Sequence, residues 1–274
     1  MTLLAADHST VPVDSDKSRA EKLRADQLGV GIGERWFCRG LEQSFEAGQV
    51  WGVLGANGTG KTTLLHTLAG LRQPQQGQVW IDGQSLSQLD SRTRARQIGV
   101  LLQEAAPAFP ATVREVVLQG RYPHLSPWQW ESAEDFERVE EALQQVGLAE
   151  LGERDQQLLS GGERQRLKIA SLLVQQPRLW LLDEPTNHLD LQHQIGLLQQ
   201  LCDGVRQRQE LLVMSLHDLN LAARFCDFLI LMHQDGSVAA GPAERLLTEP
   251  ELSRLYGHPI RRIIDQGRAI FIPL

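Results

Sequence analysis

The residues with the clearest chemical potential are a glycine-rich segment, GANGTGKT, at 55–62. It fits the pattern G-x-x-x-x-G-K-[ST], follows an apolar run typical of a buried strand (49–54) and opens a segment with leucines at helical spacing (62–71). Glycines let backbone N–H groups converge on phosphate oxygens, and a helix N-terminus adds partial positive charge. The segment therefore predicts a site for the phosphates of a nucleotide.

Two side chains of this loop have distinct expected roles. Lys61 would reach the β- and γ-phosphates, and the hydroxyl of Thr62 would ligate Mg²⁺. The residues expected to contact the nucleotide are Gly55, Ala56, Asn57, Gly58, Thr59, Gly60, Lys61, Thr62 and Thr63.

A second apolar run, RLWLLDE at 178–184, ends in two adjacent acids, Asp183 and Glu184. Because side chains alternate along a strand, the two need not share a role. Asp183 can assist Mg²⁺ binding, while Glu184 can face an attacking water as general base. Two acids at a strand end are often only solvated, but downstream of a phosphate loop the catalytic interpretation is favoured.

A third segment, LSGGERQRLKIA at 159–170, also has the features of a phosphate site. Ser160 and Glu163 have capping-box spacing, which accounts for them without any ligand. The pair Gly161 and Gly162 costs helix stability, so it indicates that something approaches the backbone closely, as a phosphate at a helix N-terminus would. Since the first loop already holds one triphosphate, we expect this site to serve a second copy, with two ATP molecules between head-to-tail chains.

Composition excludes several classes of protein. The formal net charge of −7 argues against a nucleic-acid partner, and Cys38, Cys202 and Cys226 form no CxxC pair, which predicts buried reduced thiols. The polar residues 1–22 are expected to be a disordered extension without a secretory signal. No apolar run reaches the roughly 18 residues that a membrane span needs, so other chains would have to cross any membrane.

Further apolar runs at 210–218 and 228–232 alternate with helical patterns, which predicts a parallel sheet covered by helices. Between about 104 and 158 the pattern changes to an amphipathic helical insertion. The last residues, PIRRIIDQGRAIFIPL, predict two short strands around a Gln-Gly turn.

Five motifs, GANGTGKT, LLQE, LSGGERQR, LWLLDEPTNHLD and SLHD, occur in an order and spacing that resemble an ABC-type ATPase subunit. The resemblance implies an α/β fold: a P-loop NTPase with a RecA-like core, an antiparallel β-subdomain and an inserted α-helical subdomain. It places the ATPase domain at 23–262, the helical subdomain at about 104–172 and a tail with a β-hairpin strand at 263–274.

By position, the resemblance also implies site residues. Gln103 would sense Mg²⁺ and the attacking water, Glu184 would be the general base, and His217 would be the switch residue that contacts the γ-phosphate.

On the partner-facing side, Ser160, Gly161 and Gly162 would bind the γ-phosphate held by the other copy, and Asp190 would cross the dimer interface.

The adenine contact stays open. The family often stacks an aromatic on the base, and the equivalent position here is about Ile32. Trp36 and Phe37 are alternatives that can equally belong to the core, and Arg35 can pack on the base.

The segments TVREVVLQGRYPHL and SLHDLNLAARFCDFLILM resemble ATP-binding subunits of bacterial importers for iron–siderophore complexes, haem or vitamin B12. The resemblance implies an ATP- and Mg²⁺-dependent homodimer at the cytoplasmic face of the inner membrane. Its partners would be integral-membrane permeases and, indirectly, a periplasmic substrate-binding protein. The segment 121–130 either contacts the permease or packs locally. Alternatives are an ABC transporter with other cargo or direction, a soluble ABC protein of DNA repair or translation, and a metabolic P-loop kinase.

Overall fold

The computed structural model describes residues 21–102 and 109–274. Gln103 and residues 1–20 of the expected extension lie outside the described residues. The first strand begins at Glu21, two residues before the predicted domain boundary, where Glu21 pairs with Glu46 of the neighbouring strand.

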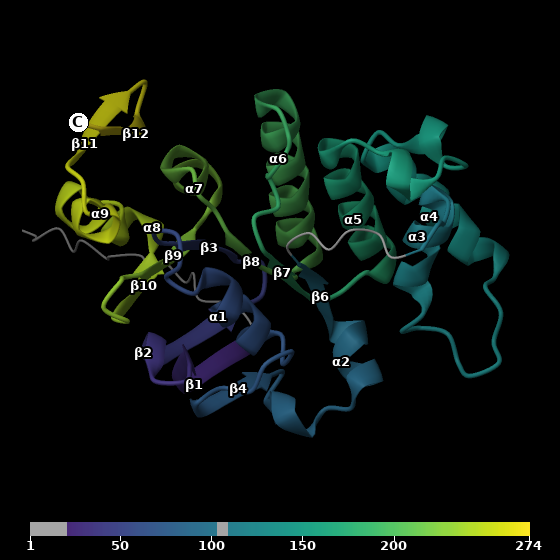
Figure 1. Cartoon of the computed structure of the whole chain (residues 1–274), viewed down its shortest axis with the longest axis horizontal. Helices are drawn as coiled ribbons and strands as arrows, with labels where there is room; N and C mark the ends of the chain where they lie inside the picture. The colour runs from purple at the N-terminus through teal and green to yellow at the C-terminus, as the bar shows by residue number, and fades with distance from the viewer. Residues whose placement is uncertain (1–20, 103–108) are drawn as a thin grey trace, which may run out of the picture.

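A six-stranded sheet forms the centre of the molecule, with strand order β10-β9-β3-β8-β7-β6 (Figure 1). Neighbouring strands from β9 to β6 are parallel, and β10 is antiparallel to β9. The predicted parallel sheet is therefore confirmed. The strands are β3 (Val50–Leu54), β6 (Ile98–Leu101), β7 (Leu179–Leu182), β8 (Leu211–Ser215), β9 (Phe228–Met232) and β10 (Val238–Pro242).

A four-stranded antiparallel sheet of order β2-β1-β4-β5 lies beside α1. Its strands are β1 (Glu21–Ile32), β2 (Arg35–Glu46), β4 (Gln76–Ile81) and β5 (Gln84–Ser85). The ring of Trp51 on β3 joins the two sheets, because it packs edge-on against Phe45 (4.6 Å between centroids) and stacks on Phe228 (4.7 Å).

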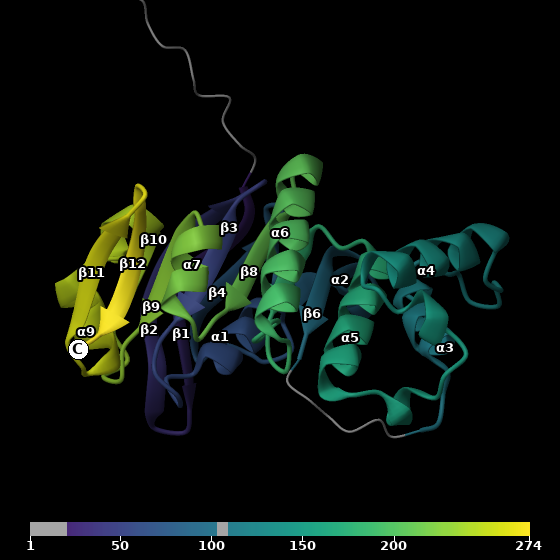
Figure 2. The same ribbon diagram turned by 90° about the horizontal axis from the view of Figure 1, so that it is seen from above.

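The helices cover the central sheet and form the insertion between β6 and β7. The α-helices are α1 (Lys61–Leu68), α2 (Ser91–Gln97), α3 (Val113–Leu118), α4 (Ala133–Gln145), α5 (Gly161–Gln175), α6 (Leu191–Arg208), α7 (Leu219–Phe225), α8 (Ala243–Leu246) and α9 (Glu249–Tyr256). Short 3₁₀ turns span Leu86–Gln88, Gln119–Arg121, Ala149–Leu151 and Gln156–Leu158. Helices α3 to α5 lie at one end of the molecule in both views (Figures 1 and 2).

The central sheet buries both faces, as expected of parallel strands. One face packs on α1 and the antiparallel sheet through residues such as Val53, Leu181 and Val213. The opposite face packs on α5 to α7 through residues such as Leu182 and Met214. These runs are continuously apolar because neither face meets water, which is why they were predictable as buried strands.

The C-terminal hairpin of β11 (Ile260–Asp265) and β12 (Arg268–Pro273) is separate from the other sheets. It begins before the predicted boundary at 262, because the side chains of Ile260 and Phe271 are buried in the main core. Likewise, α5 continues to Gln175, beyond the predicted end of the helical subdomain at 172.

The three cysteines are free and buried, as predicted. Burial raises the pKa of Cys38 to about 11 and that of Cys202 to about 12, so these thiols stay protonated. Within residues 21–102 and 109–274, no helix has the length and apolar character of a membrane span.

Candidate functional site

Three neighbouring parallel strands, β3, β8 and β7, end at one edge of the central sheet, and each is followed by residues of the predicted site. The glycine-rich loop follows β3, Asp183 and Glu184 follow β7, and His217 follows β8. Ligands of open α/β sheets bind at this carboxyl edge. The topology thus brings together motifs that lie more than a hundred residues apart in the chain.

The glycine-rich loop wraps around the ammonium group of Lys61. The Nζ atom donates to the carbonyl oxygens of Gly55 (2.8 Å) and Ala56 (3.3 Å). Gly60 has a positive φ of 90°, and a Cβ there would lie 2.4 Å from Cγ of Phe37. This position therefore requires glycine twice, for its backbone conformation and for the ring packed against it.

Burial lowers the pKa of Lys61, and the negative charges of Glu184 and Asp183 oppose that shift. A partly desolvated ammonium beside two acids is stabilised further by an incoming polyphosphate, since each added negative charge favours its protonated form. The partly desolvated ammonium of Lys61 therefore favours an anionic ligand.

Thr62 and Asp183 lie together although 121 positions separate them in sequence. The Thr62 hydroxyl donates to Oδ2 of Asp183 at 2.6 Å, and Asp183 is only 3% exposed. A hydroxyl and a carboxylate at the N-terminus of α1 are a hard oxygen donor set of the kind Mg²⁺ prefers. The residues present therefore fit the predicted Mg²⁺ site, in which Thr62 would be a ligand and Asp183 its partner.

The carboxylate of Glu184 is held by two neighbours. Its Oε1 lies 2.5 Å from Nε2 of His217, and its Oε2 accepts from the side-chain amide of Asn187. The Glu184 backbone has a positive φ of 51°, which is rare for a residue with a side chain. The structure thus brings Glu184 and His217 together and holds both beside the phosphate loop.

The segment at Ser160 has the capping box that its sequence suggested. Ser160 is the N-cap of α5, where its Oγ accepts from the Glu163 N–H (3.3 Å) and its own N–H donates to Glu163 Oε2 (2.7 Å). These hydrogen bonds lower the pKa of Glu163. Helix α5, which Ser160 caps, lies apart from α1, which begins at Lys61, in both views (Figures 1 and 2).

The two glycines after Ser160 have a neighbour in the same chain. A Cβ on Gly162 would lie 2.9 Å from the His188 carbonyl oxygen, and one on Gly161 would lie 3.3 Å from His188 Cβ. Close approach to the backbone is thus required here, as predicted, but this chain's own loop already accounts for part of it.

Gln165 ties α5 to the backbone of Glu184, whereas Asp190 lies at the start of the next helix, α6. Asp190 caps α6 by accepting from the His193 N–H (2.9 Å), and its hydrogen bonds from His193 lower its pKa. Gln165, buried on α5, donates to the carbonyl oxygens of Glu184 (3.2 Å) and Pro185 (3.0 Å). A shift of α5 would therefore act on the backbone that carries Glu184.

The candidates for the adenine contact separate into two groups. Arg35 donates to the Gly58 carbonyl oxygen (3.0 Å) and stacks over Phe37, whose ring packs on Gly60. Trp36 points to the other side of β2, against Gly29. Arg35 and Phe37 therefore border the phosphate loop, whereas Trp36 belongs to a different surface.

Sequence reasoning missed Ser215, Asn187 and Gln165, all of which contact Glu184. A serine at the end of the apolar run LLVMS was a usable signal, because a buried hydroxyl needs a partner. Gln165 had none, since a glutamine within a helix usually faces solvent.

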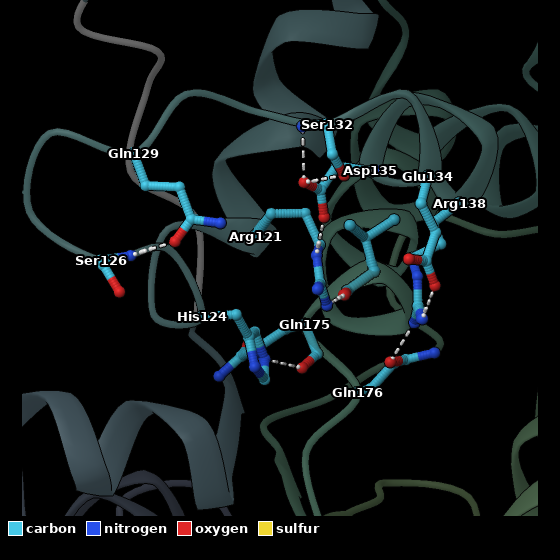
Figure 3. A network of polar contacts seen from close by, with 11 residues as sticks. Arg121, His124, Ser126, Gln129, Ser132, Glu134, Asp135, Arg138, Gln175 and Gln176 are labelled. Atoms are coloured by element: carbon cyan, nitrogen blue, oxygen red, sulfur yellow. Dashed lines mark hydrogen bonds and ion pairs between the residues drawn. The ribbon is translucent and has the colours of Figure 1, made fainter.

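A second surface lies in the insertion, at the loop before α4 (Figure 3). Arg121 donates to Asp135 (2.7 Å) and to the Val174 carbonyl oxygen (3.2 Å), and His124 Nε2 lies 2.8 Å from the Gln175 oxygen. Fixed by these contacts, the loop presents Trp128 and Trp130, which are 99% and 87% exposed.

The turn that carries Trp128 is strained. It runs from Ser126 to Gln129, closed by the Gln129 N–H on the Ser126 carbonyl oxygen (3.0 Å), and Trp128 has a φ of 70°. Glycine is usual at that position of such a turn, and a bulky residue there costs about 1–2 kcal/mol. Beside it lies an open groove of about 480 Å³ lined by Arg92, Tyr122, Leu125, Ser126, Pro127, Gln129, Trp130 and Glu131.

The family model described as ABC transporter matches residues 38–187 of the chain. The ferric enterobactin transport ATP-binding protein FepC of Escherichia coli (strain K12) is 38% identical over 255 residues, covering 92% of this chain and 94% of that protein. The hemin import ATP-binding protein HmuV of Bordetella avium (strain 197N) is 40% identical over 244 residues, covering 86% and 92%.

Among solved structures, an inward-facing structure assigned to a metal-chelate type ABC transporter superposes with a TM-score of 0.80. It is 28% identical to this chain and covers 93% of it and 98% of the solved chain. The predicted α/β P-loop fold, with its antiparallel β-subdomain and helical insertion, agrees with this likeness.

Proposed function

The chain belongs to the ABC transporter family of ATPases, and we propose that two copies of it power an importer for an iron–siderophore, haem or cobalamin-type cargo. In this proposal the homodimer lies at the cytoplasmic face of the inner membrane, beneath integral-membrane permeases that receive cargo from a periplasmic binding protein. The observation that carries the dimer is that the two predicted phosphate-binding segments belong to helices that lie apart, one to α1 and the other to α5.

In the proposed reaction the loop at 55–63 binds the triphosphate, and Lys61 compensates the charge of the β- and γ-phosphates. Mg²⁺, held by Thr62 with Asp183 and Gln103, would neutralise charge that develops on the phosphate oxygens. Glu184 would accept a proton from the attacking water, and His217 beside it would contact the γ-phosphate. Ser160, Gly161 and Gly162 of the second copy would close the site, and Asp190 would lie at the interface.

The cargo is inferred from the relatives, one named for ferric enterobactin and the other for hemin. The ATPase site holds no cargo chemistry, so uptake must be measured directly. A strain lacking this chain, offered siderophore, haem and cobalamin separately, should lose uptake of one class. Loss of none, with export of another compound impaired instead, would favour the alternative of a different ABC transporter.

The shared site can be tested by mixing two inactive variants. Lys61→Ala removes the cation of the phosphate loop and Ser160→Arg blocks the start of α5, so each homodimer should be inactive. In a mixed dimer, the intact loop of the Ser160 variant meets the intact helix of the Lys61 variant. One working site is then restored, so ATPase activity should reappear on mixing.

A control separates phosphate contact from helix capping. Ser132 forms the same type of capping box on α4, so Ser132→Ala should cost about 1 kcal/mol of stability but keep its own turnover, and it should also supply one working site in mixed dimers with Lys61→Ala. If the Lys61 and Ser160 variants do not complement while both still fold, each chain hydrolyses ATP alone and the proposal fails.

The tryptophan turn is the proposed permease contact. Two nearly fully exposed tryptophans beside a groove, Trp128 on the strained turn and Trp130 directly after it, are unfavourable unless a partner covers them. The double variant Trp128→Ser/Trp130→Ser should therefore lose co-purification with the permease and keep the ATPase rate of the isolated chain. Ile264→Ser, at an exposed aliphatic residue of the C-terminal hairpin, is the matched control. Retention of the permease by the double variant would assign these rings to another role.

A further inference from the structure

Ser215 is the last residue of β8 and the first residue of the SLHD motif, in which only His217 has an expected role. It is 0% exposed, and its neighbours at the sheet edge are Asp183 and Glu184, which directly follow the adjacent strand β7. A buried hydroxyl without partners costs free energy, so its hydrogen bonds identify what it does there.

The Ser215 hydroxyl makes two short hydrogen bonds of opposite direction. It donates to Oδ1 of Asp183 at 2.6 Å, and it accepts the backbone N–H of Glu184 at 2.8 Å. A hydroxyl has one proton to give, so donation to the carboxylate leaves its lone pairs for the Glu184 N–H. Both directions are thus fixed by the chemistry of the partners.

These bonds extend to the phosphate loop. The other oxygen of Asp183, Oδ2, accepts the hydroxyl of Thr62 at 2.6 Å. A continuous chain of hydrogen bonds therefore runs from Thr62 at the start of α1, through Asp183 and Ser215, to the backbone of Glu184. It joins the ends of three elements without the use of the Glu184 side chain.

The same strand end holds Glu184 a second time. His217, two residues after Ser215, contacts the Glu184 carboxylate, while Ser215 holds its N–H. Glu184 needs this support because its φ of 51° is unfavourable for a residue with a Cβ. Loss of the N–H acceptor would let the peptide before Glu184 rotate and would move the carboxylate.

We propose that Ser215 is a positioning residue that sets the geometry of Asp183 and Glu184 together. Its one hydroxyl orients the carboxylate of Asp183 toward the proposed metal site and the backbone of Glu184, whose carboxylate would face the attacking water. This inference rests on the proposed roles of Asp183 and Glu184, but not on the dimer, the permease or the cargo.

The test compares Ser215→Ala and Ser215→Thr in the purified chain. Ser215→Ala should bind ATP in EDTA within twofold of the unchanged protein, lower turnover at least tenfold and raise the Mg²⁺ concentration for half-maximal activity at least fivefold. Ser215→Thr keeps the hydroxyl and should restore most of both values. Ser171→Ala, which removes a half-buried hydroxyl on α5, is the matched control and should change neither.

A readout without turnover completes the design. In a Glu184→Gln background, Mn²⁺ binding in the presence of ATP can be measured from the electron paramagnetic resonance signal of free Mn²⁺. The affinity for Mn²⁺ should fall at least fivefold when Ser215→Ala is added. Ser215→Cys, which changes volume little but forms only weak hydrogen bonds, should behave like Ser215→Ala.

Two results would overturn the proposal: unchanged Mn²⁺ binding and turnover in Ser215→Ala, or unchanged Mn²⁺ binding and turnover in a folded Ser215→Cys variant. Absence of ATP binding in the unchanged protein would instead reject the proposed function, so the two failures are distinguishable.

Discussion

The His188 carbonyl oxygen lies so close to Gly162 that a Cβ added there would be 2.9 Å from it. The loop after Glu184 and the start of α5 are therefore packed backbone to backbone. Gly162→Ala should destabilise the chain by about 1–3 kcal/mol, the usual cost of overpacking, although alanine ordinarily favours a helix. Urea unfolding measures this directly.

Gly196 on α6 is the control for that substitution, because a Cβ there meets nothing within 4 Å. Gly196→Ala should stabilise the protein by up to about 1 kcal/mol through helix propensity alone. Equal effects of the two substitutions would show that the approach of His188 to Gly162 carries no strain.

Glu184→Gln should retain nucleotide binding and lose turnover by a factor of about 10²–10⁴, as expected for the loss of a general base. The amide keeps the size of the side chain and can still bond to Asn187 or His217. ATP-bound dimers should accumulate, which size-exclusion chromatography detects. Hydrolysis at the unchanged rate would remove Glu184 from its assigned role.

Arg35→Ala should weaken ATP binding about fivefold, an effect of about 1 kcal/mol, because the guanidinium stacks on Phe37 at the border of the phosphate loop. Arg39→Ala is the control, since Arg39 stacks in the same manner over Trp36 on the same strand. Titration with inorganic tripolyphosphate identifies the group that Arg35 serves. An adenine contact predicts no effect on this ligand, whereas an effect as large as that on ATP would mean that Arg35 acts through Gly58.

Asp135→Asn should lower the free energy of unfolding by about 3 kcal/mol, because it leaves the Arg121 guanidinium in a mostly buried site without its partner. Glu134→Gln removes the exposed Glu134–Arg138 pair one residue away and should cost less than about 1 kcal/mol. Urea unfolding at neutral pH distinguishes the two.

The difference in the free energy of unfolding between Asp135→Asn and the unchanged protein should also depend on pH. Hydrogen bonds from Ser132, and then the contact with Arg121, lower the pKa of Asp135 below its ordinary 3.8. A depressed carboxyl pKa contributes stability that is fully present above pH 3.8 and is lost as the pH falls through the folded-state value. A difference that stays constant through that acid range would contradict this account.

The strands of the functional edge were predictable because each is a continuous apolar run that ends in a loop with polar or charged residues. Strands β1 and β2 were not, since they alternate less regularly and their register shifts between Ala25 and Leu28, where Gln27 has a φ of 47°. A local bulge of this kind depends on the partner strand, which periodicity within one segment does not report.

The site residues were predictable as types but not as contacts. Motif spacing indicated Lys61 and Glu184, yet the hydrogen bonds of Ser215 and Gln165 depend on how β7, β8 and α5 meet in space. Gln103 remains a prediction because it lies outside the described residues. The roles of Ser160 and Asp190 across a dimer also remain predictions, although both residues cap helices in the single chain.

Asn220 has a practical consequence for anyone who modifies the end of this polypeptide. Its side-chain amide forms two hydrogen bonds with the main chain of Phe271: Oδ1 accepts from the N–H at 2.8 Å, and Nδ2 donates to the carbonyl oxygen at 3.3 Å. Asn220 lies three positions after His217, which contacts the Glu184 carboxylate, so an affinity tag or truncation that loosens the final hairpin should displace His217. Tagged and untagged preparations should therefore be checked against each other before ATPase rates from different preparations are compared.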